Sequence, residues 1–176
     1  MLKKLILALL VALPMSAAAQ KFGIVRIDEV IPAMSEFTDM QKQITEASQK
    51  YEAEFQKLNE QLQKLYTDFQ AIQNDTTTPE TIKERRMQEI QDTAAKVEQF
   101  RQTATQDLER QQAQLMAPIQ QRVNEAIQAV GKEGAYTFIF PNEPNLLLYQ
   151  GSDVIDITPL VKSKLGLSTT ATPAAQ

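Results

Sequence analysis

The stretch from Phe37 to Val130 constrains the fold most, because it contains no glycine and only two prolines, Pro79 and Pro118. In its first half an apolar residue recurs every seventh position, and a second apolar set follows each of these by three or four residues. The positions are Phe37, Met40, Ile44, Ala47, Tyr51, Phe55, Leu58, Leu62, Leu65, Phe69 and Ile72. This alternation gives a helix one narrow apolar seam that it can bury against another helix.

The second half repeats this pattern less regularly. Its apolar positions are Ile90, Ala94, Val97, Ala104, Leu108, Leu115, Ile119, Val123, Ala126 and Val130. Six residues, 74–79, separate the two runs, and Thr78-Pro79-Glu80 is typical of a helix start. Two long helices joined by a short turn predict an antiparallel helical hairpin. The first helix, predicted over Thr38–Gln73, is about 50 Å long. We therefore interpret residues 37–130 as an arm with its tip near 74–79.

Strand-forming segments flank the arm. Lys21–Ile27 predicts a buried strand. Tyr136–Phe140 and Leu146–Tyr149 predict a β-hairpin, and residues 154–157 predict a further extended piece. Gly131 is expected to end the second long helix. The predicted fold is mostly α with a small β body, in which the long hairpin projects from a β-rich oligomerisation base formed by 20–36 and 131–166.

This body has only three or four short strands, with a short helix from Thr158 after them. Such a core is small, so we expect the body to oligomerise. The residues expected to build the assembled body are Phe22, Ile24, Ile27, Phe138, Phe140, Leu146 and Leu148.

The first nineteen residues have the features of a secretory signal peptide. Lys3 and Lys4 precede an apolar core at 5–13, and small residues lead up to Ala19. The apolar core is too short for a permanent anchor. We predict cleavage after Ala19, export, and no stable membrane insertion. Residues 167–176 are small and polar and are predicted to be disordered.

Composition argues against several classes of function. Without Lys3 and Lys4 the chain has 16 basic and 22 acidic residues, a net charge of −6, which is unfavourable for nucleic-acid binding. Histidine and cysteine are absent, so a Ser-His-Asp triad is impossible and the commonest metal ligand is missing. No phosphate-binding glycine loop is present. We expect no enzyme activity, no cofactor, no metal and no nucleic-acid partner.

Four apolar residues of the arm lie off the seam: Tyr66, Met87, Phe100 and Met116. One interpretation is local wrapping of one helix on the other. The other is an adaptable lining that contacts unfolded chains, for which methionine and aromatic side chains are suited. Pro118 predicts a kink where the arm leaves the body, and it is interpreted as either a hinge or a static bend.

The order of signal peptide, Phe22-Gly23-Ile24-Val25-Arg26-Ile27, helical hairpin and closing strands resembles the Skp/OmpH family of periplasmic chaperones. The most specific match is the closing stretch from Tyr149 to Thr158, an aromatic residue followed by S-D-V-x-D-I-T. The resemblance implies a periplasmic homotrimer with a β-rich body and three helical arms around a cavity. It also implies ATP-independent holding of unfolded outer-membrane β-barrel proteins, which prevents their aggregation.

The charge of the arm departs from the family pattern. Well-known members have strongly basic arms, whereas residues 37–130 carry 11 basic and 15 acidic residues, a net of −4. We therefore carry over neither electrostatic capture of acidic clients nor a lipopolysaccharide site, and expect mainly apolar holding. The alternative is a structural or adaptor coiled coil of the cell envelope that binds one folded partner through the arm tip. Residues 74–79 contain no large apolar side chain, which favours the holdase.

Overall fold

The computed structural model describes residues 20–143 and 146–168. They divide into two compact units: a hairpin unit, Ile31–Arg122, and a sheet unit, formed by the described residues up to Val30 and from Val123 onward. The fold is mostly helical with one small sheet, so the predicted fold class is confirmed. The expected signal peptide, 1–19, and most of the expected disordered tail, from residue 169, lie outside the described residues.

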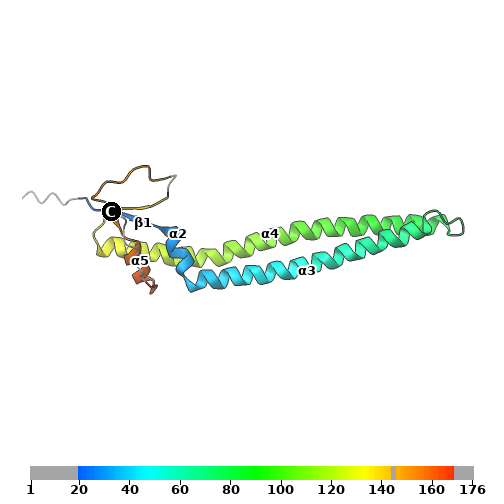
Figure 1. The fold of residues 1–176 in the computed structure, drawn as a ribbon, viewed down its shortest axis with the longest axis horizontal. Helices are drawn as coiled ribbons and strands as arrows, with labels where there is room; N and C mark the ends of the chain where they lie inside the picture. Colours follow the sequence, from blue (N-terminus) through cyan, green and yellow to red (C-terminus); the bar gives the residue numbers. More distant parts are fainter. Residues whose placement is uncertain (1–19, 144–145, 169–176) are drawn as a thin grey trace, which may run out of the picture. The chain divides into compact units, whose positions relative to one another are not determined.

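The hairpin unit begins with a 3-10 turn, η1 (Ile31–Ala33), and contains two long helices. Helix α3 spans Ser35–Ile72, and helix α4, which spans Glu80–Glu133, begins in this unit. The two helices run side by side within the unit (Figure 1). Every predicted seam residue on both helices is buried or half-buried. Met40, Ile90, Ala104 and Ile119 are the most deeply buried seam residues in this unit.

Polar contacts also join the two helices. The Tyr51 hydroxyl donates a hydrogen bond of 2.5 Å to Asp107 Oδ2, which also accepts one from the Gln111 side chain. Arg122 forms an ion pair with Glu36. Because each contact needs one partner from each helix, both favour one register of α3 against α4.

The sheet unit contains three short strands and two short helices. Strand β1 (Phe22–Val25) lies between β2 (Phe138–Pro141) and β3 (Ile155–Asp156), and both neighbours run parallel to it. Helix α2 spans Ile27–Val30 and helix α5 spans Thr158–Lys164. The buried apolar core of this unit consists of Ile24, Val25, Val30, Val123, Ala126, Val130, Ile157 and Val161.

Two sequence predictions about these strands and helices are wrong. Leu146–Tyr149 is not a strand; the Leu146 and Leu147 amides donate to the Glu143 carbonyl in a turn, and the far side of β1 pairs with β3 instead. Helix α4 does not end at Gly131 but continues to Glu133. A Cβ added at Gly131 would lie 3.1 Å from Ile139 Cδ1, so glycine here allows close packing of β2 on the helix.

Candidate functional site

Helical geometry divides the hairpin unit into two faces. A residue three positions before a seam residue lies about 60° to one side of the seam. In an antiparallel pair, equal offsets on the two helices project from the same face of the hairpin. Tyr66, Met87 and Met116 each precede a seam residue by three positions, namely Phe69, Ile90 and Ile119. They therefore share one face.

An open groove of about 270 Å³ lies on this same face. Four of its lining residues, Ser48, Glu52, Arg101 and Thr105, obey the same three-residue offset; the others are Tyr51, Phe55, Phe100, Ala104 and Leu108. We call the face that carries this groove and the three off-seam residues the groove face. Its lining is aromatic and aliphatic along the seam and polar at the rim.

The cation at the rim of the groove, Arg101, is paired within α4. Arg101 donates two hydrogen bonds to Glu98, of 2.8 and 3.1 Å. These bonds lower the pKa of the Glu98 carboxyl and raise the pKa of the Arg101 guanidinium. Because Arg101 is already paired with Glu98, it is not an unpaired cation that could attract an acidic ligand to the groove.

The opposite face is polar. Two further grooves, of about 260 and 460 Å³, open there. Seven of their lining residues directly precede a seam residue and so lie about 100° to the other side of the seam. They are Glu36, Asp39, Gln43, Glu46, Lys50, Pro118 and Arg122. Six of these seven side chains are charged or carry an amide, whereas the groove face has exposed sulfur and aromatic groups.

The four predicted client-contact residues lie in different environments. Tyr66 is 44% exposed and Met87 39% exposed, whereas Phe100 and Met116 are half-buried. The Phe100 ring packs against Tyr51, with 6.0 Å between ring centroids, and lines the groove. Tyr66, Met87 and Met116 project from the groove face, while Phe100 forms part of its floor.

Ile82 is an exposed apolar residue that the sequence interpretation missed. It lies eight residues before Ile90, which places it about 80° to the opposite side of the seam. The structure describes three large exposed apolar residues in the hairpin unit: Tyr66, Ile82 and Met87. All three lie near the turn that joins α3 to α4. The sequence could have indicated this residue, because Ile82 is an isoleucine near the start of the second helix that does not belong to the repeating seam pattern.

The turn between the helices is organised by Asp75. Its carboxylate accepts hydrogen bonds from the Thr77 amide and from the Thr77 and Thr78 hydroxyls, at 2.7 to 2.8 Å. These bonds lower the pKa of the Asp75 carboxyl from 3.8 to about 2, and the bond from the Thr77 amide contributes most. The turn is therefore held by an ionised carboxylate.

Pro118 lies inside α4, which is continuous from Glu80 to Glu133. The proline has no amide N–H to give to the carbonyl of Gln114, four residues earlier. It lines a groove with Glu36, Asp39, Met40 and Gln43, which lie in the first turns of α3. The hinge interpretation stays a prediction.

The sheet unit carries a second apolar surface. The rings of Phe22, Phe138 and Phe140 form a stacked row, with centroids 6.3 and 6.0 Å apart. Of the residues predicted to build the oligomeric body, Ile24 is buried, and Phe22 and Ile27 are half-buried. Phe138, Phe140, Leu146 and Leu148 are exposed, and Leu148 reaches 91%.

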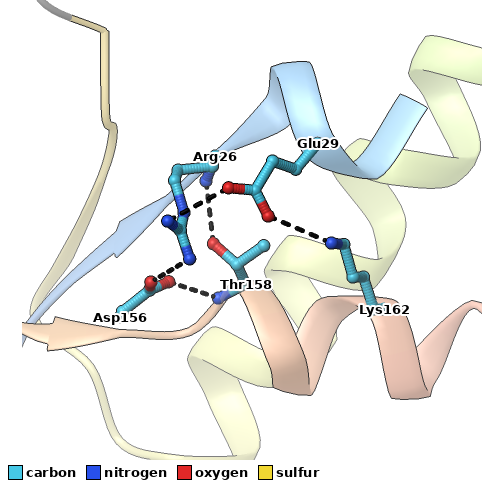
Figure 2. Close-up of polar contacts among 5 residues, drawn as sticks. All are labelled: Arg26, Glu29, Asp156, Thr158 and Lys162. Carbon is cyan, nitrogen blue, oxygen red and sulfur yellow. Dashed lines mark hydrogen bonds and ion pairs between the residues drawn. The ribbon is translucent and has the colours of Figure 1, made fainter. Parts of the chain in front are cut away.

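Within the sheet unit, a polar network fastens the closing segment to β1 (Figure 2). Arg26 bonds the Asp156 carboxylate at 2.8 Å, and the Asp156 carboxylate also accepts the Thr158 amide. The buried Thr158 hydroxyl accepts the Arg26 amide at 2.9 Å, and Lys162 pairs with Glu29. The D-I-T part of the closing motif thus supplies one carboxylate and one hydroxyl that attach β3 and α5 to the end of β1.

Among the described residues, no three His, Cys, Asp or Glu side chains gather in a way that could hold a metal ion. None of the helices in the described part of the chain is long and apolar enough to cross a membrane.

A model of the family described as "Outer membrane protein (OmpH-like)" matches residues 21–165. The chain belongs to the OmpH-like family. The family resemblance noted in the sequence is therefore confirmed, and the match spans both units of this OmpH-like chain.

The fold has a counterpart among solved structures. A crystal structure from Caulobacter crescentus CB15, of a protein assigned as an OmpH-like outer membrane chaperone, matches this chain with a TM-score of 0.68. The match covers 83% of each chain at 16% sequence identity, so it shows a shared fold. A search of curated protein sequences gives no match.

Proposed function

We propose that this OmpH-like protein is an ATP-independent periplasmic holdase, which binds unfolded outer-membrane β-barrel proteins and prevents their aggregation. The observation that carries the proposal is the groove face: Tyr66, Met87 and Met116 project from the same face that contains the aromatic groove. Membership of the OmpH-like family and the likeness to a structure assigned as a chaperone support it.

The proposed mechanism is multiple weak apolar contacts. Each exposed aromatic or methionine side chain contributes at most about 1.5–3 kcal/mol when fully covered. Flexible methionine and broad aromatic rings contact many sequences without a fixed geometry. A client held this way can dissociate and fold elsewhere, because no single contact is strong.

We also propose that the protein works as a homotrimer assembled through the sheet unit. The stacked row Phe22–Phe138–Phe140, together with Leu146 and Leu148, offers apolar surface that a single chain leaves exposed. Three chains would bring three groove faces to one client, so the weak contacts would act together.

The test is the aggregation of a urea-unfolded outer-membrane barrel diluted into buffer, with and without the mature protein. We expect a soluble complex and a barrel that stays out of the pellet. The double variant Tyr66→Ser/Met87→Ser should hold the barrel several-fold less well. The matched control, Gln63→Ser/Gln91→Ser, replaces exposed polar residues on the same two helices and should hold normally. A wild-type protein that lets the barrel aggregate would refute the holdase.

One observation favours the adaptor as a second candidate. Tyr66, Ile82 and Met87, the large exposed apolar residues described in the hairpin unit, all lie near its turn, as a docking patch for a folded partner would. Two variants separate the candidates. Met116→Ser, far along α4 from the turn, should weaken a holdase but not an adaptor. Ile82→Ser, on the opposite face, should weaken an adaptor that uses the whole tip but leave the groove-face holdase unchanged.

A further inference from the structure

The sulfur chemistry of this chain is concentrated in its methionines. The sequence contains six methionines and no cysteine, so no thiol is present to react first with an oxidant. Met1 and Met15 fall in the expected signal peptide. Four methionines, Met34, Met40, Met87 and Met116, remain in the expected mature chain.

These four sulfur-bearing side chains differ sharply in access to solvent. Met34 is 1% exposed and Met40 4% exposed, and Met116 is half-buried. Met87 is 39% exposed. It lies on the groove face beside the turn, at the same offset from the seam as Tyr66.

Peroxides convert such a methionine into its sulfoxide. The sulfur lone pair attacks one peroxide oxygen, the O–O bond breaks, and the second oxygen leaves as water after proton transfer. The sulfur is oxidised by two electrons and hydrogen peroxide is reduced. The product is a polar, chiral side chain in place of a flexible apolar one.

We infer that Met87 is the oxidation site of this protein, and that its conversion to the sulfoxide by peroxide reversibly weakens client holding. Met87 is chosen because an oxidant must reach the sulfur from solvent, and Met87 is the most exposed of the four methionines. Met40, by contrast, is buried in the seam between the helices. Its position gives the modification a consequence, because the new S=O group would lie on the face proposed to contact apolar client segments. This second half rests on the proposed holdase function.

The experiment treats the full mature protein with hydrogen peroxide and follows each methionine by peptide mass mapping. We expect Met87 to oxidise first, Met116 more slowly, and Met34 and Met40 only when the protein unfolds. Equal oxidation rates, or Met116 ahead of Met87, would overturn the assignment. This readout does not depend on any client.

The same samples are then tested for holding of an unfolded outer-membrane barrel. Loss of apolar contact at one side chain should raise the Kd by about fivefold. Treatment with both methionine sulfoxide reductases should restore it. For Met87→Leu, which has no sulfur at this position, the Kd should be the same before and after peroxide, whatever its starting value. Met87→Gln should resemble the oxidised protein without treatment. Met116→Leu is the matched control and should remain as sensitive as the wild type.

The outcomes separate this inference from the proposed function. If untreated protein holds the barrel and the Met87 sulfoxide holds it equally well, the holdase stands and the redox effect is refuted. If untreated protein does not hold the barrel, the holdase and the redox effect both fall, while the mass map still decides the oxidation site.

Discussion

The hairpin unit and the sheet unit expose apolar surface in different ways. Three large exposed apolar residues are described in the hairpin unit, Tyr66, Ile82 and Met87. Seven are described in the much smaller set of residues of the sheet unit: Phe138, Phe140, Leu146, Leu148, Tyr149, Ile155 and Leu160. Sparse apolar groups suit transient contacts, whereas a dense apolar surface suits a permanent interface. This contrast supports the proposed division of roles, in which the sheet unit assembles the protein and the hairpin unit contacts the client.

The largest expected effect is loss of assembly. Leu148→Asp places a charge at the most exposed leucine of the sheet unit, where the proposed interface would desolvate it. Since each chain of a symmetric assembly carries the change, we expect light scattering to report a single-chain mass. Gln150→Asp, in the same loop, is the control and should keep the assembled mass. An unchanged mass for Leu148→Asp would show that the assembly does not use the exposed apolar surface around Leu148.

The next effect concerns the attachment of the closing segment. Thr158→Val removes the buried hydroxyl that accepts the Arg26 amide, and we expect a loss of about 1–3 kcal/mol in the free energy of unfolding. Urea denaturation measures it. Ser163→Ala, on the exposed side of α5, should change stability far less. If both variants unfold alike, the closing motif has no special role in holding the sheet unit together.

A smaller effect is expected from salt. The arm is net acidic and Arg101 in the groove is already paired, so client affinity should depend little on ionic strength. Titration of the barrel at low and high salt measures this dependence. A steep fall in affinity with salt would show that charge, rather than the groove face, captures the client.

The smallest effect concerns the turn of the hairpin. The pKa of Asp75 is lowered to about 2, so its ionised form stabilises the folded turn above about pH 4. That contribution is lost as the pH falls through about 2. Asp75→Asn should therefore be slightly less stable than the wild type at neutral pH, and the difference should disappear only below about pH 2. An NMR titration of the Asp75 carboxyl checks the pKa directly, and a value near 3.8 would contradict the network.

Much of the hairpin unit was predictable because its order is local. Seam residues repeat every three or four positions, and a helix brings such residues to one side whatever lies elsewhere in the chain. The off-seam set of Tyr66, Met87, Phe100 and Met116 was visible in the same way. Their division between a projecting group and a groove floor was not, because it depends on how Tyr51 and Phe100 pack across the two helices.

By itself, the sequence determined the fold class, the helical hairpin, the family and the absence of thiol and imidazole chemistry, since these follow from periodicity, motifs and composition. The tertiary structure decided the strand pairing. Leu146–Tyr149 has the composition of a strand, yet β3 takes the place beside β1, because Asp156 and Thr158 bind Arg26 across more than a hundred residues. Local propensity selects strand-like segments, but only long-range hydrogen bonds and packing select their partners.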